Sequence, residues 1–323
     1  MKSHSKNLYA AMTIFGAMSV LPLSPVYAQS QSGQKSARVF SEVYSPEIPR
    51  AVTFAGQKID LDRVDMYERL DRELTSMAYT HGNTQLVLKR ANKYFPEIIP
   101  ILRKNGIHED LVYIACIESF LNPRAVSVAG AAGVWQFMKG TGQQYGLEIN
   151  QYVDERYNLE KATEAACKYF RKAYEKYGNW ESVAASYNAG TARISKELDA
   201  QKQTTAYNLF LNDETSRYIY RMISMKLIME NPQAYGYLLS DAQLYQPVRT
   251  KTVTVDYPVE NWAEWASKHG ISYMQLRDFN PWIRDKSLPN KTGKAYSVKI
   301  PELKDLKRSS QQHKTYNSNW TVD

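Results

Sequence analysis

The chain has 323 residues, 43% of them hydrophobic, and a formal net charge of +8 at pH 7. This length allows one sizeable domain plus a small one, and the mild positive charge favours anionic partners. No compact stripe of Lys and Arg runs along the sequence, so nucleic acid is a poor fit and the anionic polymers of the cell envelope are a better one.

Residues 1–28 have the pattern of a secretory signal peptide. Lys2 and Lys6 supply its positive charge, residues 10–21 form a short apolar core, and the sequence Val-Tyr-Ala ends at Ala28, where a signal peptidase would cleave. Cleavage there removes two of the 41 basic residues and lowers the net charge from +8 to +6. An uncleaved anchor is the alternative, although the apolar core is shorter than the ~20 residues of a membrane span. No Cys follows this core, so we expect an exported, periplasmic protein with neither a lipid anchor nor an integral membrane span.

The next part of the chain divides into a linker and a helical region. Residues 29–63 are polar and punctuated by Pro, which predicts a linker. Over residues 64–240 apolar side chains recur every three to four positions, as in helices packed on a core. Two helical pieces are expected around Pro96, with Gly106 ending the second. Strand-like alternation is almost absent before Lys251, so this region is predicted to be mainly α.

The two cysteines, Cys116 and Cys167, both fall on apolar helix faces. In an oxidising compartment they could form a disulfide; otherwise they would be two buried thiols acting as small hydrophobic residues. The sequence leaves both alternatives open. Neither CxxC nor HxxxH spacing is present, so we expect no metal site and no cofactor.

A single carboxylate, Glu118, lies near the end of an apolar helix predicted at residues 108–120. Asn122 and Pro123 stop this helix, because a residue before Pro avoids the helical conformation. Aromatic residues lie nearby in the sequence, so poor solvation should raise the pKa of Glu118, and the negative end of the helix acts in the same direction. Such a carboxyl can donate a proton to a leaving oxygen, as in glycosidases. The alternative is an exposed helix-end residue, the usual place of a Glu.

Several motifs around Glu118 occur together. The stretch ESFLNPRAVSVAGAAGVWQFM at residues 118–138 is preceded by KRANKYF at residues 89–95 and followed by TGQQYGL at residues 141–147 and ASYNAG at residues 185–190. This series resembles the lytic transglycosylase family with a goose-lysozyme-like catalytic domain, and within it the membrane-bound lytic murein transglycosylase D branch. The resemblance implies a lysozyme-like helical domain with its core at about residues 90–235, acting on the glycan strands of peptidoglycan.

The resemblance also implies roles for matching positions. Glu118 matches the sole catalytic acid/base, and Ser119 would support the helix end that carries it. Five positions match residues that contact the substrate: Ser127, Gln136, Met138, Tyr187 and Asn188. Among them Ser127 would steer the reacting hydroxyl, whereas the Tyr-Asn pair would bond to the acid and to the N-acetyl sugar. The Gly and Ala residues at 129–133 would let the backbone approach a bulky polysaccharide.

A lone acid suits the chemistry that the family implies. An ordinary glycosidase uses two carboxyls, but the motif holds no second one. Asp154 and Glu155 are the downstream candidates for a second acid, and they fit better as residues before a helix that begins near Leu159. The family instead lets the N-acetyl group of MurNAc stabilise the cationic sugar. Glu118 would protonate the bridging oxygen and then take the proton of the sugar's own 6-hydroxyl, which gives a 1,6-anhydro end. Two alternatives remain, a lysozyme-type hydrolase and a non-enzymatic wall-binding scaffold.

The C-terminal part reads as a small separate module. After a linker at residues 241–250, residues 251–302 give the order strand, helix, helix, strand, and a polar tail follows at residues 303–323. The stretch ENWAEWASKHGISYMQLRDFNPWI resembles a LysM domain, a peptidoglycan-binding family. Residues 258–261 replace the usual Gly-Asp-Thr entry of that family, so glycan binding stays open. If the module binds glycan, tethering raises the effective concentration of substrate at the active site.

Overall fold

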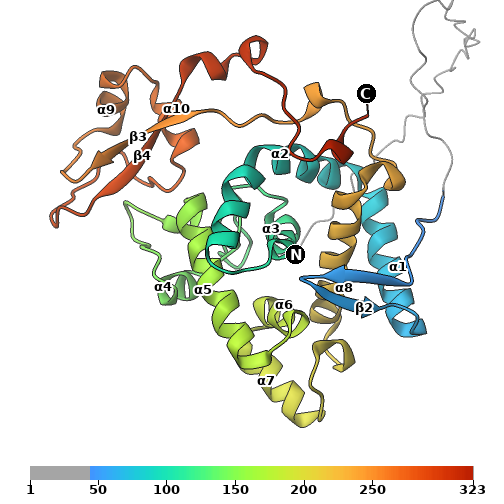
Figure 1. Cartoon of the computed structure of the whole chain (residues 1–323). Coiled ribbons are helices and arrows are strands. Elements are labelled where there is room, and N and C mark those ends of the chain that lie inside the picture. The colour runs from blue at the N-terminus through green and yellow to red at the C-terminus, as the bar shows by residue number, and fades with distance from the viewer. Residues whose placement is uncertain (1–43, 323) are drawn as a thin grey trace, which may run out of the picture. The chain divides into compact units, whose positions relative to one another are not determined.

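The computed structural model describes residues 44–322. The predicted signal peptide at residues 1–28 and the first part of the predicted linker lie outside the described residues. The helices and strands all belong to the unit Ser45–Asp323 (Figure 1). In chain order they are β1 (Ala51–Phe54), β2 (Gln57–Asp60), α1 (Val64–Tyr79), α2 (His81–Lys104), α3 (Val112–Ser119), α4 (Lys139–Gln144), α5 (Leu159–Tyr177), α6 (Trp180–Ala189), α7 (Thr191–Ala200), α8 (Asp213–Glu230), β3 (Thr250–Val255), α9 (Trp262–Lys268), α10 (Tyr273–Phe279) and β4 (Tyr296–Pro301). This order confirms the predicted fold class, a mainly α domain followed by a small β-α-α-β module.

Helix α8 contacts several other helices of the helical domain. It packs against α1, α3 and α6, and Figure 1 shows α1 and α8 side by side. The short helix α3 is buried along its whole length except at Glu118. Burying one large aliphatic side chain contributes about 1.5–3 kcal/mol, so the packing of α3 against α8 fixes the position of the end that carries Glu118. Among residues 44–322, none of the helices combines the length and the apolarity needed to cross a membrane.

A β-hairpin precedes the first helix, where the sequence predicted only a linker over residues 29–63. Strands β1 and β2 pair antiparallel around Ala55 and Gly56, whose φ angles are 49° and 79°, as a two-residue hairpin turn requires. Val52 and Ile59 lie opposite each other and are buried. The linker prediction was wrong for this hairpin because strands of four residues alternate too briefly to differ from a loop.

Helix α2 runs without interruption through Pro96 and Pro100, where the sequence predicted two helical pieces. Both prolines lie on the exposed face of the helix. Each Pro removes the N–H donor to the carbonyl four residues earlier, but because both rings lie on the outer face they displace no core side chain, and the helix continues through them. As predicted, Gly106 follows the end of the helix, with a φ of 69°.

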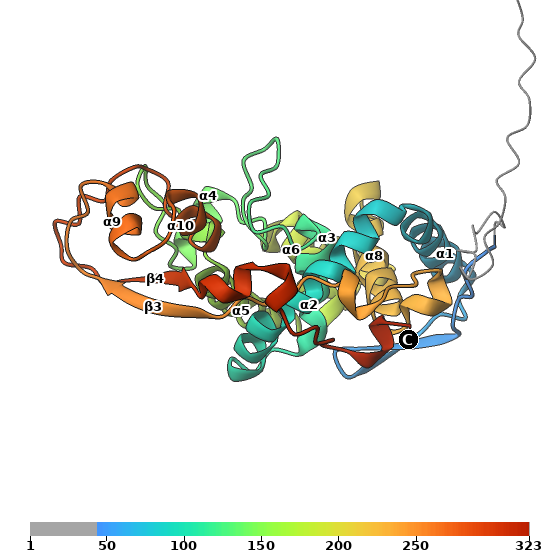
Figure 2. The same cartoon turned by 90° about the horizontal axis from the view of Figure 1, so that it is seen from above.

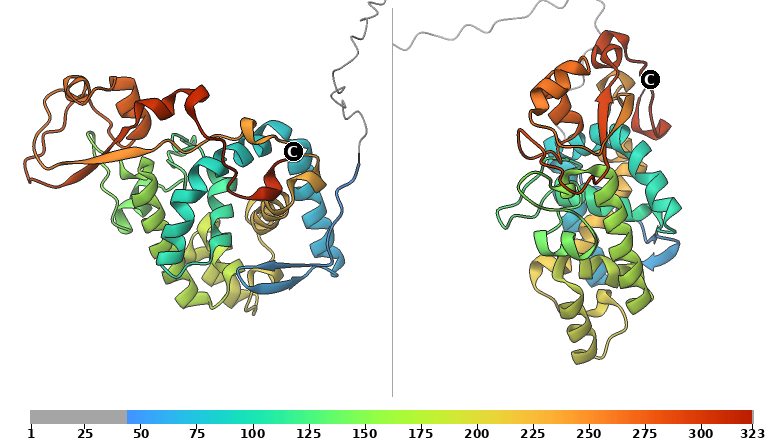
Figure 3. Two further views of the ribbon diagram at one scale, coloured as in Figure 1. Left: turned by 45° about the horizontal axis from the view of Figure 1, so that its top comes forward. Right: turned by 90° about the vertical axis from the view of Figure 1, so that its left-hand side faces the viewer.

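The C-terminal module consists of an antiparallel strand pair and two short helices, seen from further sides in Figure 3. β3 pairs with β4 with Val253 opposite Val298, and α9 and α10 lie between them in the sequence. Trp262, Leu276 and Val298 are fully buried in the module. Asn261 caps α9 through its side-chain oxygen, which accepts a bond from the Ala263 N–H. The segment that replaces the usual LysM entry thus starts a helix.

The predicted polar tail returns to the helical domain. Trp320 is buried, its indole N–H donates to the Met229 carbonyl at 2.7 Å, and its ring lies 5.7 Å from that of Phe95. The side chain of Asn92 donates to the carbonyls of Tyr245 and Lys314, so α2 holds both the segment before the module and the tail after it. The tail prediction missed this contact because one aromatic residue among polar ones leaves no periodic pattern.

Candidate active site

Glu118 lies one residue before the end of α3. The helix stops because Phe120 and Leu121 have φ angles of 52° and 54°, outside the right-handed helical range. The side chain of Ser119 donates to the carbonyls of Ala115 and Val134, at 3.1 and 2.8 Å. The second bond ties the helix end to the loop that follows it, whereas the first closes on α3 itself.

The surroundings of Glu118 favour its neutral form. Burial raises the pKa of Glu118, whereas the hydrogen bond from Tyr218 and the charge of Arg221 lower it and the charge of Glu214 raises it. Burial dominates because the carboxylate loses its hydration, as the sequence predicted. The large apolar residues that follow Glu118 in its motif differ in exposure: Trp135 is fully buried, Phe137 is buried and Met138 is 46% exposed.

The hydroxyl that bonds to Glu118 belongs to Tyr218 on α8, which sequence reasoning missed. Its O–H donates to Glu118 Oε1 at 2.7 Å, and burial raises the pKa of Tyr218, so it keeps its proton. Tyr187, the tyrosine expected to bond to the acid, donates instead to the Trp135 carbonyl at 2.7 Å. Tyr218 lies on the buried face of an amphipathic helix in a chain with 24 tyrosines. The sequence around it is therefore that expected around an ordinary core residue.

The loop between α3 and α4 holds three of the expected substrate-binding residues and projects from the helices in Figure 2. Ser127 Oγ accepts a bond from the Ala131 N–H at 3.0 Å. Gln136 has a φ of 49°, and its side-chain amide donates to the carbonyls of Ala125 and Gly133 at 3.2 and 2.8 Å. Both polar side chains therefore close the loop on itself. Met138, at the start of α4, is the most exposed of the three.

One small residue of this loop, Gly133, is required by the fold itself. A Cβ atom on Gly133, whose φ is +79°, would lie 1.9 Å from the Arg156 carbonyl oxygen. A Cβ atom on Gly130 would meet nothing within 4 Å. Gly133 therefore gives the chain's own backbone the room that it needs, and the expected approach of a polysaccharide to residues 129–133 stays a prediction.

Asn188 and the two acids Asp154 and Glu155 are the remaining residues that the sequence singled out. Asn188, in the last turn of α6, accepts a bond from the Thr215 hydroxyl of α8 at 2.9 Å. Asp154 and Glu155, weighed as second acids, are both engaged elsewhere. Asp154 pairs with Arg156 at 2.7 Å, and Glu155 accepts from the Glu148 N–H at 2.8 Å.

A cleft of about 560 Å³ lies beyond the end of α3. The turn at Asn122, Pro123 and Arg124 lines one side of it, and the module residues Asp278 and Trp282 line another. Its lining does not include Glu118, so the cleft adjoins the turn after the acid rather than the acid itself.

Both cysteines are buried free thiols. Burial raises the pKa of Cys116 and raises that of Cys167 to about 12, so neither is a reactive thiolate near neutrality. Of the two alternatives left open by the sequence, the structure has the buried thiols. Within residues 44–322, His, Cys, Asp and Glu side chains form no group of three or more that could hold a metal ion.

Comparison with known families defines the class of each part. Residues 97–210 match the transglycosylase SLT domain family, and residues 251–304 match the C-terminal LysM-like domain of soluble lytic transglycosylases. The chain therefore contains an SLT domain followed by a LysM-like domain, as the sequence predicted.

Individual relatives agree with this assignment. The chain is 30% identical to membrane-bound lytic murein transglycosylase D of Escherichia coli K12 over 226 residues, 68% of this chain and 48% of the relative. It is 28% identical to membrane-bound lytic murein transglycosylase C of Haemophilus ducreyi over 149 residues, 42% of this chain and 40% of the relative. The chain thus spans less than half the length of either.

Solved structures show partial likeness. The 70-kDa soluble lytic transglycosylase of Escherichia coli is 20% identical, with a TM-score of 0.39 over 53% of this chain and 34% of that one. An inactive variant of a lytic transglycosylase from Pseudomonas aeruginosa is 19% identical, with a TM-score of 0.36 over 50% of this chain and 32% of that one.

Proposed function

We propose that the chain is a peptidoglycan lytic transglycosylase that cleaves the MurNAc-β-1,4-GlcNAc bond without water and leaves 1,6-anhydro-MurNAc ends. The observation that carries the proposal is the state of Glu118. It is a largely buried carboxyl within the SLT domain, burial raises its pKa, and it accepts a hydrogen bond from Tyr218. A raised pKa keeps a larger share of the carboxyl protonated at a given pH, and the protonated form is the one that can act as a general acid.

The proposed reaction consumes no water and returns Glu118 to its starting form. Glu118 gives its proton to the bridging oxygen as the bond from that oxygen to carbon 1 of MurNAc breaks, and the N-acetyl group stabilises the cationic sugar. The 6-hydroxyl oxygen then bonds to carbon 1 and its proton passes to the Glu118 carboxylate. Because nucleophile and electrophile share one ring, the second step gains from proximity. Tyr218 stabilises the carboxylate between the two steps through its hydrogen bond.

The remaining assignments follow from the same proposal. Substrate would contact Ser127, Gln136, Met138, Tyr187 and Asn188, whose positions are described above. The enzyme would be exported to the periplasm after loss of residues 1–28. The domain division would be that expected from the sequence, with the hairpin of β1 and β2 and the anchored tail added to the helical domain.

A lysozyme-type hydrolase is the second candidate, and Glu214 is the observation that favours it. The charge of Glu214 acts on Glu118 and raises its pKa. Glu214 lies exposed in the first turn of α8. If it served as the second carboxyl of a hydrolase, Glu214→Gln would abolish turnover; in a lytic transglycosylase the variant stays active.

The masses of the products from purified sacculi test the proposal. An intramolecular ring closure gives muropeptides lighter by one water than those of hydrolysis, with no reducing MurNAc end. We expect anhydro products from both the wild type and Glu214→Gln. Reducing ends as the main product would instead establish the hydrolase.

A further inference from the structure

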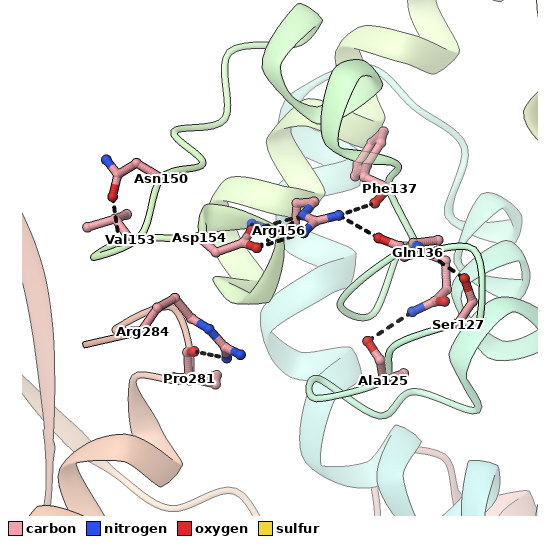
Figure 4. Close-up of polar contacts among 12 residues, drawn as sticks. Ala125, Ser127, Gln136, Phe137, Asn150, Val153, Asp154, Arg156, Pro281 and Arg284 are labelled. Carbon is pink, nitrogen blue, oxygen red and sulfur yellow. Dashed lines mark hydrogen bonds and ion pairs between the residues drawn. The ribbon is translucent and has the colours of Figure 1, made fainter. Parts of the chain in front are cut away.

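The side chain of Arg156 donates hydrogen bonds to the loop between α3 and α4. One nitrogen, Nη1, donates to the carbonyls of Gly130 and Phe137 at 2.8 and 3.1 Å, while Nε and Nη2 pair with the Asp154 carboxylate (Figure 4). The Arg156 side chain is only 10% exposed. A guanidinium, which presents five N–H donors in a fixed plane, can satisfy a carboxylate and two carbonyls together.

The loop is held together by its own β-bridges, so bonds from Arg156 to two of its carbonyls fix the whole loop. Val126 and Ala132 form a β-bridge, and so do Ala132 and Phe137. The backbone of Gly133 lies directly under the Arg156 carbonyl. The residues from 125 to 137, which we call the substrate loop, therefore contact both the side chain and the backbone of Arg156.

The segment that carries Asp154 pairs with the LysM-like module. The Asp154 N–H donates to the Trp282 carbonyl at 2.9 Å, and Val153 forms a β-bridge with Ile283. The Arg284 N–H donates to the Tyr152 carbonyl at 2.8 Å. We call residues 150–154 the docking segment, because these bonds pair its backbone with that of the module.

Apolar packing joins the same three parts. Ala132 of the substrate loop and Val153 of the docking segment belong to the buried cluster that contains Trp282 and Ile283 of the module. All four side chains are at most 3% exposed. The core of the module is therefore completed by residues of the SLT domain, which a freely tethered module would not need.

Ion pairs also join the module to the helical domain. Lys299 of β4 lies 2.7 Å from Glu97 and 3.1 Å from Glu160, and Lys294 pairs with Glu148 and lies 3.5 Å from Glu155. Two lysines of the module thus face four carboxylates of the helical domain.

From these contacts we propose that Arg156 is a positioning residue that fixes the substrate loop, and that the LysM-like module, by pairing with the docking segment, keeps Arg156 in place. The module would then be a structural part of the active site, whether or not it also binds glycan. The kinetic consequences rest on the proposed function, whereas the effect on the loop does not.

The first test is Arg156→Lys in the whole chain. Lysine keeps a positive charge beside Asp154 but cannot reach all three acceptors, so amide hydrogen exchange over residues 125–137 should quicken while α3 stays protected. On soluble glycan strands KM should rise and kcat/KM should fall by about ten- to a hundredfold, with the pH at which activity declines unchanged. Arg171→Lys is the control, because Arg171 also donates to a backbone carbonyl, that of Asn105, far along the chain from the loop; it should match the wild type in exchange and kinetics.

A second variant tests the same proposal in case Arg156→Lys does not fold. If Arg156→Lys does not melt cooperatively, Asp154→Asn combined with Arg156→Gln removes both charges and leaves neither buried alone. Wild-type exchange over residues 125–137 in the folded variant would overturn the role of Arg156. Fast exchange with unchanged kinetics would show that Arg156 fixes the loop but that the loop does not position substrate, which overturns the positioning role. A wild type that fails to turn over glycan would instead count against the proposed function.

The second test concerns the module. Lys294→Glu combined with Lys299→Glu places two negative charges against four others, and exchange should quicken first in residues 150–154 and also in residues 125–137. Lys251→Glu combined with Lys268→Glu makes the same charge change at two exposed lysines of the module and should leave both segments protected. The module's part is overturned if residues 150–154 become exchangeable while residues 125–137 do not, or if neither segment responds.

Discussion

Glu118→Gln is expected to reduce turnover by about a thousandfold or more, because glutamine can neither donate the proton that the leaving oxygen needs nor accept the one from the 6-hydroxyl. Binding to sacculi should survive, since the amide keeps the shape of the side chain and can still accept the Tyr218 hydrogen bond. Turnover is measured by release of soluble muropeptides, and binding by co-sedimentation with sacculi.

The same variant should be more stable than the wild type near neutrality. Folding raises the pKa of Glu118, so the folded chain binds more protons there than the unfolded chain, and stability falls as pH rises above the unfolded pKa. Glutamine removes this loss. The melting temperature of the variant should exceed that of the wild type near neutral pH, and the difference should vanish in acid, where the carboxyl is protonated in both states.

Glu181→Gln is the matched control. Glu181 is another carboxyl whose pKa is raised by burial, but it lies in the first turn of α6. It should show full turnover. Wild-type activity in Glu118→Gln, or equal losses in both variants, would contradict the assignment of Glu118 as the acid.

Gly133→Ala is the second large effect that we expect. The added methyl group would meet the Arg156 carbonyl oxygen at 1.9 Å, and the φ of +79° is strained for alanine in addition. Either the substrate loop or the Arg156 backbone must move, which should destabilise the fold by about 2 kcal/mol or more and lower kcat/KM at least about tenfold. Chemical denaturation and initial rates on soluble glycan strands measure the two effects.

Gly130→Ala separates the clash from the backbone strain. Its φ is +85°, similar to that of Gly133, but its Cβ would have open space. Only the conformational cost of about 1–2 kcal/mol is then expected. Equal losses in the two variants would show that contact with Arg156 is not what requires glycine at position 133.

The helices could be predicted because their signal repeats. α5 and α8 each carry apolar residues at helical spacing over several turns, and the β-α-α-β order of the module follows from two alternating stretches around two helical ones. The hairpin could not be predicted, because its strands of four residues alternate too briefly to differ from a loop. The anchor at Trp320 could not either, because it depends on one side chain that meets a distant part of the chain. Helix α2 shows the opposite case, in which two prolines suggested a break that their exposed positions make unnecessary.

The residues of the site also differ in whether the sequence could indicate them. Glu118 and the loop residues lie in one continuous motif, so a family pattern could indicate them. Tyr218 comes from α8, a hundred residues further on, and nothing in its local sequence sets it apart from other buried tyrosines. The local sequence did not indicate Arg156 either, because its role depends on two backbone carbonyls and on a module that begins only at residue 251.

The ionisation of Glu118 can be measured directly by carbon-13 NMR titration of the glutamate carboxyls in the whole chain, with Glu118→Gln identifying its signal. We expect Glu118 to titrate above the ordinary value of 4.5. In Tyr218→Phe it should titrate higher still, because the carboxylate loses the hydrogen bond that stabilises it. A signal that titrates at or below the ordinary value in the wild type would contradict the proposal that this carboxyl holds its proton for the leaving oxygen.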